Sequence, residues 1–235
     1  MTGFGINSCM WIGLPAQPRV SSAKAMTRVF SLMGLITGGA VTFVLLSCGQ
    51  LVVAAQPDPV LDHVFPAGGQ AGTSVDVTVA GSGLTGITEL RCSHAAITSS
   101  TEDGKLFRLT IPDSVPHGHY DISALTESGF SSVRSFMVGP LPEQSEAAVN
   151  DLLDDSEPVS IDSVTNGRIE KAGDVDHFAF VAKRGQRVVV ECQAERIDSR
   201  LRAVLQVFDA TGRRQGVNRG FFGIDPLIVF DVPAD

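Results

Sequence analysis

The stretch Lys171–Glu195, KAGDVDHFAFVAKRGQRVVVECQAE, decides the fold, because a polar turn is followed there by two runs of alternating apolar residues. Phe178 and Phe180 are two apart in the first run, and Val188 and Val190 are two apart in the second. A repeat of two puts alternate side chains on one face of an extended chain. The stretch therefore predicts two strands, each with one buried face, joined by a hairpin turn at KRGQ.

The same repeat of two runs through the sequence after residue 56, and no window longer than about ten residues has helical spacing. The predicted inward-facing residues are Val75, Val77, Val79, Phe107, Leu109, Ile111, Tyr120, Ile122, Ala124, Phe136, Val138, Leu201, Ala203, Leu205 and Val207. Glycine-containing turns separate the runs. We therefore predict an all-β protein with two β-sandwich domains, at residues 56–139 and 159–235. The acidic stretch 140–158 between them is expected to be an extended, solvated linker.

Residues 1–55 have the composition of an export leader, since all 26 acidic residues of the chain lie after Ala55. From Met26 onward a basic residue is followed by an apolar run over 29–46, and small residues precede the bond after Ala55. This order is typical of a signal peptide. We predict cleavage after Ala55 and an exported protein, which is secreted, periplasmic or held at the cell surface. Residues 1–25 precede this leader and are expected to be an over-extended start without structure.

The leader also admits two other interpretations. Cys48, in LLSC, resembles the cysteine of a lipobox, which would become a lipid-modified N-terminus. The apolar run is also long enough to remain as a membrane anchor. Apolar sequence continues after Cys48, and Val53-Ala54-Ala55 matches a cleavage site, so the pattern favours full cleavage and no membrane segment in the mature chain.

Cleavage after Ala55 would leave an acidic chain with two cysteines. Three of the 18 basic residues precede Ala55, so residues 56–235 carry a net charge of −11. Such a surface repels nucleic acid and anionic lipid, which argues against both as partners. Cys92 and Cys192 are in phase with apolar neighbours and are predicted to be buried free thiols, with a disulfide between them as the alternative.

Two resemblances add to this pattern. The stretches VFPAGGQAGTSVDVTVAGSGL (64–84) and IPDSVPHGHYDISALTESGFSSVRSFMV (111–138) resemble an immunoglobulin-like domain of the IPT/TIG kind. The later motifs NGRI, AGDVDHFAF, GQR and FDATGR, in that order, resemble the bacterial pre-peptidase C-terminal domain, a jelly-roll-like sandwich of exported proteins. That resemblance implies a further strand after VPAD. The domain at 159–235 is therefore expected to be incomplete, either as part of a longer exported protein or with an open edge that another chain covers.

The polar turn before Phe178 offers two carboxylates to a cation, because Asp174 and Asp176 fall on one side of an extended chain. Some relatives of the pre-peptidase domain bind Ca²⁺, and the candidate ligands here are Asp174, Asp176, Asp198, Asn218 and Asp225. Arg202 and Arg219 stand where the resemblance implies further acids, whereas Ca²⁺ requires about six or more oxygens. We therefore expect a polar rim without a cofactor, in which His177 faces solvent; a calcium-stabilised structural domain is the alternative.

The sequence lacks the GxSxG, HExxH and GxxxxGK motifs of common enzyme classes, so we expect no catalytic activity. In the loop NRGFFGIDP, residues 218–226, Phe221 and Phe222 lie outside any alternating run. They either cap the end of the sandwich or anchor a partner. We expect an exported, non-catalytic binding or spacer module at or outside the bacterial cell surface, with a protein or glycan partner. The alternative is the N-terminal accessory part of a larger secreted peptidase.

Overall fold

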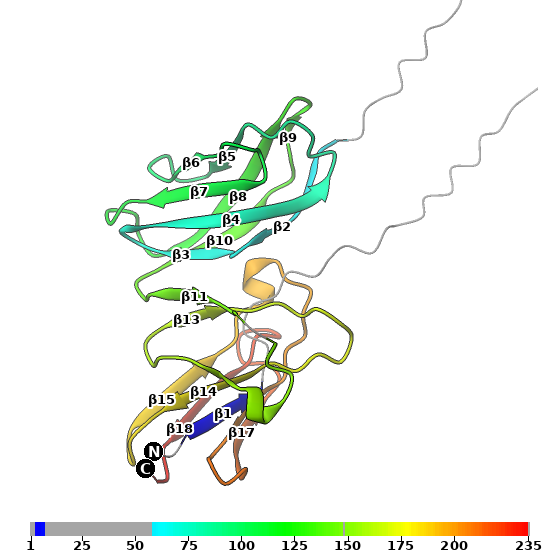
Figure 1. Ribbon diagram of the computed structural model, residues 1–235. Helices are drawn as coiled ribbons and strands as arrows, with labels where there is room; N and C mark the ends of the chain where they lie inside the picture. The colour runs from blue at the N-terminus through cyan, green and yellow to red at the C-terminus, as the bar shows by residue number, and fades with distance from the viewer. Residues whose placement is uncertain (1–2, 8–57, 148, 235) are drawn as a thin grey trace, which may run out of the picture. The chain divides into compact units, whose positions relative to one another are not determined.

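A computed structural model of the chain describes residues 3–7, 58–147 and 149–234. The predicted signal peptide and its cleavage site lie outside these residues. Within them the regular elements are strands, apart from two 3-10 turns, η1 (Leu153–Asp155) and η2 (Glu195–Ile197) (Figure 1). No helix in the described part is long and apolar enough to cross a membrane. The all-β prediction is confirmed.

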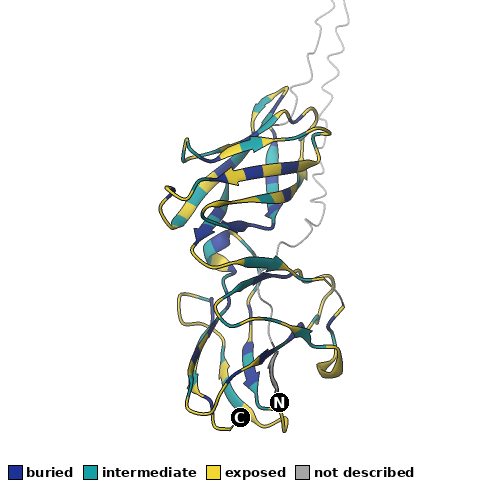
Figure 2. Cartoon of the chain, turned by 60° about the vertical axis from the view of Figure 1, so that its left-hand side comes forward, coloured by how far each residue is buried: buried dark blue, intermediate teal, exposed yellow. Residues whose placement is uncertain are grey.

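The first sandwich is built from two sheets, one with the order β2-β4-β7-β6 and the other with the order β3-β10-β8-β5, where β9 also pairs with β8. The bounds are β2 Val60–Phe65, β3 Gly68–Gln70, β4 Thr73–Ser82, β5 Glu89–Cys92, β6 Thr98–Ser100, β7 Leu106–Ile111, β8 Gly118–Thr126, β9 Gly129–Phe130 and β10 Arg134–Gly139. All pairings are antiparallel except that of β3 with β10. Buried and exposed residues alternate along these strands (Figure 2).

The core of the first sandwich lies between these two sheets, where the alternation predicted it. In β7 the side chains of Phe107, Leu109 and Ile111 are buried, while the residues between them are exposed. Phe136 of β10 and Ile122 of β8 are fully buried in the same cluster. Each such side chain stabilises the fold by about 1.5–3 kcal/mol through its removal from water.

Predictions for single residues in and around this core are largely confirmed. The Tyr120 hydroxyl donates a hydrogen bond to the Pro116 carbonyl at 2.6 Å and so ties the preceding turn to β8. In the described part of the chain, Cys92 and Cys192 form no disulfide, as expected. Cys192 is fully buried, whereas Cys92 is only half-buried, and burial raises the pKa of the Cys92 thiol.

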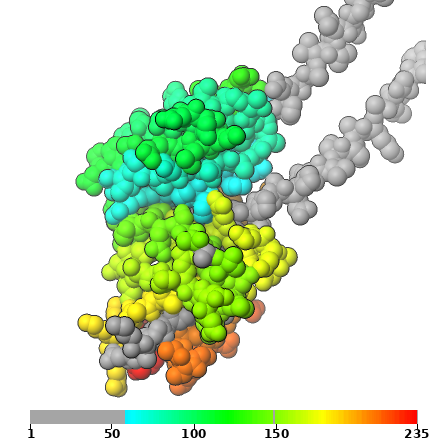
Figure 3. Space-filling view, viewed as in Figure 1, coloured from blue at the N-terminus to red at the C-terminus, as the bar shows by residue number. Residues whose placement is uncertain are grey.

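The acidic stretch 140–158 is largely exposed, as expected of a solvated segment, but two short parts of it pair with strands that follow it. β11 (Glu143–Ser145) pairs in parallel with β13 (Val164–Asn166), and β12 (Glu157–Pro158) pairs in parallel with β14 (His177–Val181). Asn150, between them, is buried. In Figure 3 the green atoms of this stretch lie against the yellow atoms that follow it. The paired strands provide hydrogen-bond partners for the backbone of β11 and β12. The hydrophobic pattern of the sequence did not predict these pairings.

The second sandwich has a five-stranded sheet of order β12-β14-β1-β16-β17 and a two-stranded sheet of β15 and β18. The remaining bounds are β1 Gly3–Asn7, β15 Arg187–Glu191, β16 Leu205–Phe208, β17 Arg214–Asn218 and β18 Leu227–Asp231. Its core combines Phe178 and Phe180 of β14 with Val188 and Val190 of β15, all nearly inaccessible to solvent. The inward pairs predicted from the opening stretch therefore face one another across the sandwich.

The expectation that residues 1–25 have no structure is wrong for Gly3–Asn7. These residues form β1, which is antiparallel to β14 on one side and to β16 on the other. Five residues of β14 and three of β16 have a partner in β1. β14 and β16 do not pair with each other, so β1 joins them into one sheet. In doing so it pairs with the backbone groups along one edge of each strand.

The two turns of the second sandwich have different roles. Asp209 and Gly212 close a true hairpin between β16 and β17, with the Gly212 amide bonded to the Asp209 carbonyl at 2.9 Å. At KRGQ the Gln186 amide bonds to the Lys183 carbonyl, but β14 and β15 lie in different sheets. The prediction of a hairpin there is wrong, because each strand pairs with a distant segment. Gly185 has the positive φ, 77°, that such a turn requires.

Candidate functional site

The most distinctive surface feature is the aromatic loop, residues 219–225, which connects β17 to β18. Phe221 and Phe222 at its tip are 61% and 45% exposed. Their rings meet edge to face, with centroids 4.8 Å apart and planes at 83°. Large apolar side chains are seldom left in water as neighbours, and such pairs recur where proteins contact partners. Of the two interpretations open from the sequence, capping the sandwich and anchoring a partner, this exposure favours the second.

The backbone of the aromatic loop is closed by hydrogen bonds around one residue. The amides of Phe221 and Phe222 donate to the Asp225 carbonyl at 2.8 and 3.1 Å, and the Asp225 amide donates to the Phe222 carbonyl at 3.0 Å. Gly223, at φ 63°, makes the reversal possible, because a side chain in this conformation is strained. An added Cβ at Gly223 would also lie only 2.3 Å from Glu195 Oε2. The loop is therefore held in one shape and its two rings are presented in a fixed geometry.

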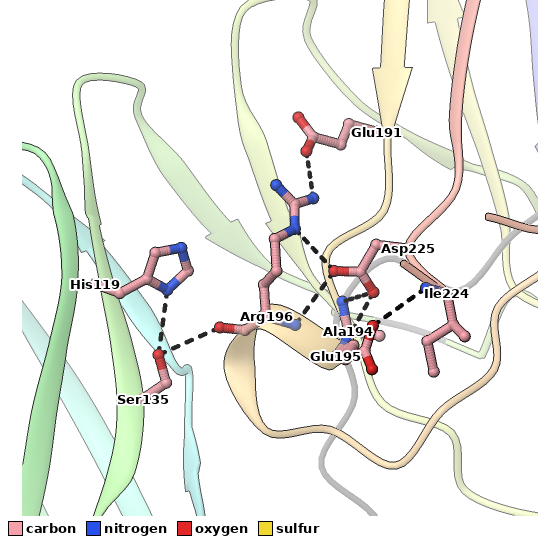
Figure 4. A network of polar contacts seen from close by, with 8 residues as sticks. All are labelled: His119, Ser135, Glu191, Ala194, Glu195, Arg196, Ile224 and Asp225. Atoms are coloured by element: carbon pink, nitrogen blue, oxygen red, sulfur yellow. Dashed lines mark hydrogen bonds and ion pairs between the residues drawn. The ribbon is translucent and has the colours of Figure 1, made fainter. Parts of the chain in front are cut away.

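The Asp225 carboxylate anchors this loop in the interior. It is fully buried and accepts hydrogen bonds from the amides of Ala194, Glu195 and Arg196, at 2.9, 2.7 and 3.2 Å (Figure 4). The Arg196 Nε also donates to it at 2.9 Å. Burial by itself raises the pKa of this carboxyl, but the hydrogen bonds from Arg196 and the three amides outweigh it, so the pKa is lowered. Asp225 is thus an ionised anchor with its oxygens already occupied.

Arg196 links the buried anchor to the exposed rings. Its guanidinium carbon lies 4.7 Å from the centroid of the Phe222 ring, within the range of a cation–π contact. The same guanidinium forms ion pairs with Glu191 and Asp225. Two carboxylates therefore hold the guanidinium in the position where it contacts the Phe222 ring. Nearby, Glu195 Oε2 accepts a hydrogen bond from the Ile224 amide at 3.2 Å, which fixes the other side of the loop (Figure 4).

The predicted cation ligands do not form one site. Asp198 Oδ2 accepts a hydrogen bond from the Ser135 amide at 2.8 Å, and Asn218 Oδ1 accepts one from the Gly220 amide at 2.8 Å. Asp225 is engaged as the anchor of the aromatic loop. Asp174 and Asp176 alone lie together, and a residue that sequence reasoning missed, Asp151, completes a group of three.

One carboxylate oxygen each of Asp151, Asp174 and Asp176 lies within 4.8 Å of the others, at a cavity of about 230 Å³. The cluster is already neutralised in part by Lys171. Its ammonium forms an ion pair with Asp151 and lies 3.7 Å from Asp174. The hydrogen bond from Lys171 lowers the pKa of Asp151, and Asp174 Oδ2 accepts a further bond from the Glu170 amide at 2.8 Å. Protein donors thus already engage the carboxylates of Asp151 and Asp174.

Asp151 was missed because it lies in the acidic stretch taken for a linker, and the only signal was the general excess of acids there. The same stretch explains a wrong expectation for His177. Its side chain is buried, not solvent-facing, and its Nδ1 lies 3.1 Å from the Asn150 carbonyl. The His177 amide donates to the same carbonyl at 3.0 Å. Backbone packed across the end of β14 covers the imidazole, which strand alternation alone does not predict.

Comparisons with known proteins do not assign this chain to a family. No family model matches the sequence, and no curated protein matches it. One similar solved structure is the γ-CGTase of alkalophilic Bacillus clarkii, with 13% identity over 77% of this chain and 27% of that chain, at a TM-score of 0.28. Another is SGBP-B of the mixed-linkage glucan utilization locus of Bacteroides ovatus, in complex with a mixed-linkage heptasaccharide, with 11% identity over 77% of this chain and 48% of that chain, at a TM-score of 0.29. This chain thus corresponds to less than half the length of either protein, and at these TM-scores the likeness says nothing about its function.

Proposed function

We propose that this chain is an exported, non-catalytic binding module that contacts a protein or glycan of the cell envelope through the aromatic loop, residues 219–225. The observation that carries the proposal is the exposure of Phe221 and Phe222 on a loop whose shape is fixed by the buried Asp225. A loop that served only to connect β17 to β18 would gain nothing from two exposed phenylalanines.

The energetics of the aromatic loop support this role. Covering both rings with a partner would remove apolar surface from water, at about 25 cal/mol per Å². Association usually loses part of this gain to the ordering of mobile side chains. Here the hydrogen bonds of Asp225 and the contact of Arg196 with Phe222 order the loop beforehand. More of the burial free energy therefore remains as affinity.

The chemistry of the loop fits a partner that offers an apolar face with polar edges. The phenylalanine rings have no hydrogen-bonding group, so they recognise C–H surface, whether from a side chain or from a pyranose ring. Glu195 is exposed beside them and supplies a hydrogen-bond acceptor at the rim. The Arg196 guanidinium already forms ion pairs with two carboxylates. We therefore assign it a role in holding the loop and not in contacting the ligand.

The test measures binding with and without the rings. Co-sedimentation with purified peptidoglycan tests binding to a glycan of the cell envelope. The double variant Phe221→Ala/Phe222→Ala is expected to lose any retention seen with the wild-type chain. Phe130→Ala is the matched control, because Phe130 is 59% exposed on β9 of the other sandwich. Retention that survives in the double variant, or that Phe130→Ala abolishes equally, would overturn the assignment to the aromatic loop.

A further inference from the structure

The five-stranded sheet of the second sandwich depends on a strand from the far end of the sequence. β1 (Gly3–Asn7) is the middle strand, with β12 and β14 on one side and β16 and β17 on the other. Residues 8–57 separate it from the next described part of the chain. The adjoining strands β14 and β16 contact each other only through β1 in the order of this sheet. The strand gap between β14 and β16 is therefore a distinct feature of the second sandwich.

An empty strand gap would expose hydrogen-bonding groups beside the core. The facing edges of β14 and β16 pair with β1 at five and three positions, respectively. Phe178 on β14 and Leu205 on β16 are fully buried next to this gap. Backbone donors and acceptors left unpaired at such an edge are costly when buried and attract other strands when exposed. The gap therefore has a strong tendency to take up an extended segment.

The register of β1 defines the chemistry that the gap accepts. Phe4 and Ile6 occupy the positions opposite Phe180 and Phe178. Residues directly opposite each other in an antiparallel pair share one face of the sheet, and this face of β14 is the core. An occupant therefore needs apolar residues at two positions two apart, with one residue between them on the outer face. It runs antiparallel to both β14 and β16.

We propose that the strand gap between β14 and β16 binds an extended segment of another polypeptide in the mature protein, in place of β1. Cleavage after Ala55, predicted from the sequence, would detach Gly3–Asn7 from the chain that carries the gap. The occupant is a strand with the pattern apolar-x-apolar, held by backbone hydrogen bonds along both of its edges. This is recognition by β-strand addition, in which the ladder supplies affinity and alternate side chains supply specificity. The inference rests on the export that the proposed function includes, but not on the aromatic loop, which is separate from the strand gap.

The experiment uses the full chain with a fluorescent peptide of residues 1–8, MTGFGINS, as the probe for a strand supplied in trans. Ile6→Asp in the chain puts a carboxylate at the register position opposite Phe178 and is expected to release β1 from the strand gap. Asn7→Asp is the matched control, one position along, opposite His177. Peptide binding is followed by fluorescence anisotropy, and hydrogen exchange reports the amides of 177–181 and 206–208.

The tethered strand competes with the peptide at an effective concentration in roughly the millimolar range. Its release in the Ile6→Asp chain should therefore tighten peptide binding by about tenfold or more relative to Asn7→Asp. Bound peptide should slow exchange at 177–181, and a peptide that itself carries Ile6→Asp should not bind. If the Ile6→Asp chain is folded but does not bind the peptide, the proposal is overturned.

A second measurement does not depend on the folding of a variant. Wild-type chain with excess peptide is expected to show one peptide per chain by native mass spectrometry, together with faster exchange of the amides of Gly3–Asn7. Absence of this complex at peptide concentrations well above roughly the millimolar range overturns the proposal. So does a dimer that forms without peptide and is abolished by Ile6→Asp, because the occupant would then be a second copy of this chain.

Discussion

At the scale of single residues, Asp225 anchors the aromatic loop to the segment after β15. Its carboxylate is fully buried and accepts hydrogen bonds from three amides and one guanidinium. Asp225→Ala leaves these donors unpaired, so we expect the free energy of unfolding to fall by about 3–5 kcal/mol. Urea denaturation followed by circular dichroism measures this loss. Asp231→Ala, at an exposed carboxylate on β18, is the control and should change stability by less than about 0.5 kcal/mol.

The pH dependence provides a separate check on the charge of Asp225. Its pKa is lowered in the folded protein, so its contribution to stability is present above the unfolded pKa, about 3.8, and is lost as the pH falls through the folded pKa. The difference in stability between wild type and Asp225→Asn should therefore shrink as the pH falls below about 4. A difference that stays constant down to pH 2 would mean that the charge of Asp225 contributes nothing.

Glu143 has the opposite behaviour. Its carboxylate accepts a hydrogen bond from Asn166 Nδ2 at 2.9 Å, but burial raises its pKa to about 7 from 4.5. A raised folded pKa gives stability that is complete below the unfolded pKa and is lost as the pH rises from about 4.5 through 7. Glu143→Gln cannot ionise, so we expect it to be more stable than wild type at pH 8, by about 1–3 kcal/mol.

Thermal and urea unfolding of Glu143→Gln at pH 5 and pH 8 measure this effect. The advantage of the variant should appear between these two values, because the wild-type carboxyl ionises between them. Glu102→Gln is the control for the loss of an acidic side chain, since Glu102 lies exposed in a loop of the first sandwich. An equal slope of stability against pH in wild type and Glu143→Gln would contradict the raised pKa of Glu143.

At the scale of elements, local pattern predicted what depends on local sequence. Alternation identified the buried faces of β7, β14 and β15, because a strand with one buried face has a repeat of two. Pairing between strands depends on distant segments, so neither the insertion of β1 nor the crossover at KRGQ was visible in the pattern. The same limit applies to the candidate sites. Adjacent Phe221 and Phe222 were found from sequence, whereas Asp151 reaches Asp174 only through the packing of the acidic stretch.

The loop before β14 is expected not to depend on calcium. Lys171 neutralises part of the charge of Asp151 and Asp174, and the Glu170 amide occupies an oxygen of Asp174. A bound cation would have to displace the ammonium, and the three clustered carboxylates supply few of the oxygens that Ca²⁺ requires. The melting midpoint should therefore be the same in millimolar CaCl₂ and in excess EDTA. A rise with CaCl₂ that follows RT ln(1 + [L]/Kd) would show instead that the loop binds the ion.

At the scale of the whole molecule, the cleavage after Ala55 that the sequence predicts would link export to the occupancy of the strand gap. The pattern at Val53 and Ala55 predicts cleavage after Ala55, so the protein recovered after export should begin at Gln56. Intact-mass spectrometry and N-terminal sequencing of the exported protein measure this directly. Ala55→Arg places a large charged residue where the peptidase requires a small one and should prevent cleavage, while Gln50→Arg, outside the recognised positions, should not.

The predicted cleavage would give the mature protein and its precursor different protection in the second sandwich. Without β1, the edges of β14 and β16 have no partner from their own chain, so the amides at 177–181 should exchange faster in the exported protein than in uncleaved Ala55→Arg. The amides of β15 and β18 pair with each other and should change little, which makes them an internal control. Equal protection of 177–181 in the two proteins, with no second polypeptide present, would show that the second sandwich closes without a strand in the gap. An exported protein that still contains Gly3–Asn7 would place β1 in the mature protein itself.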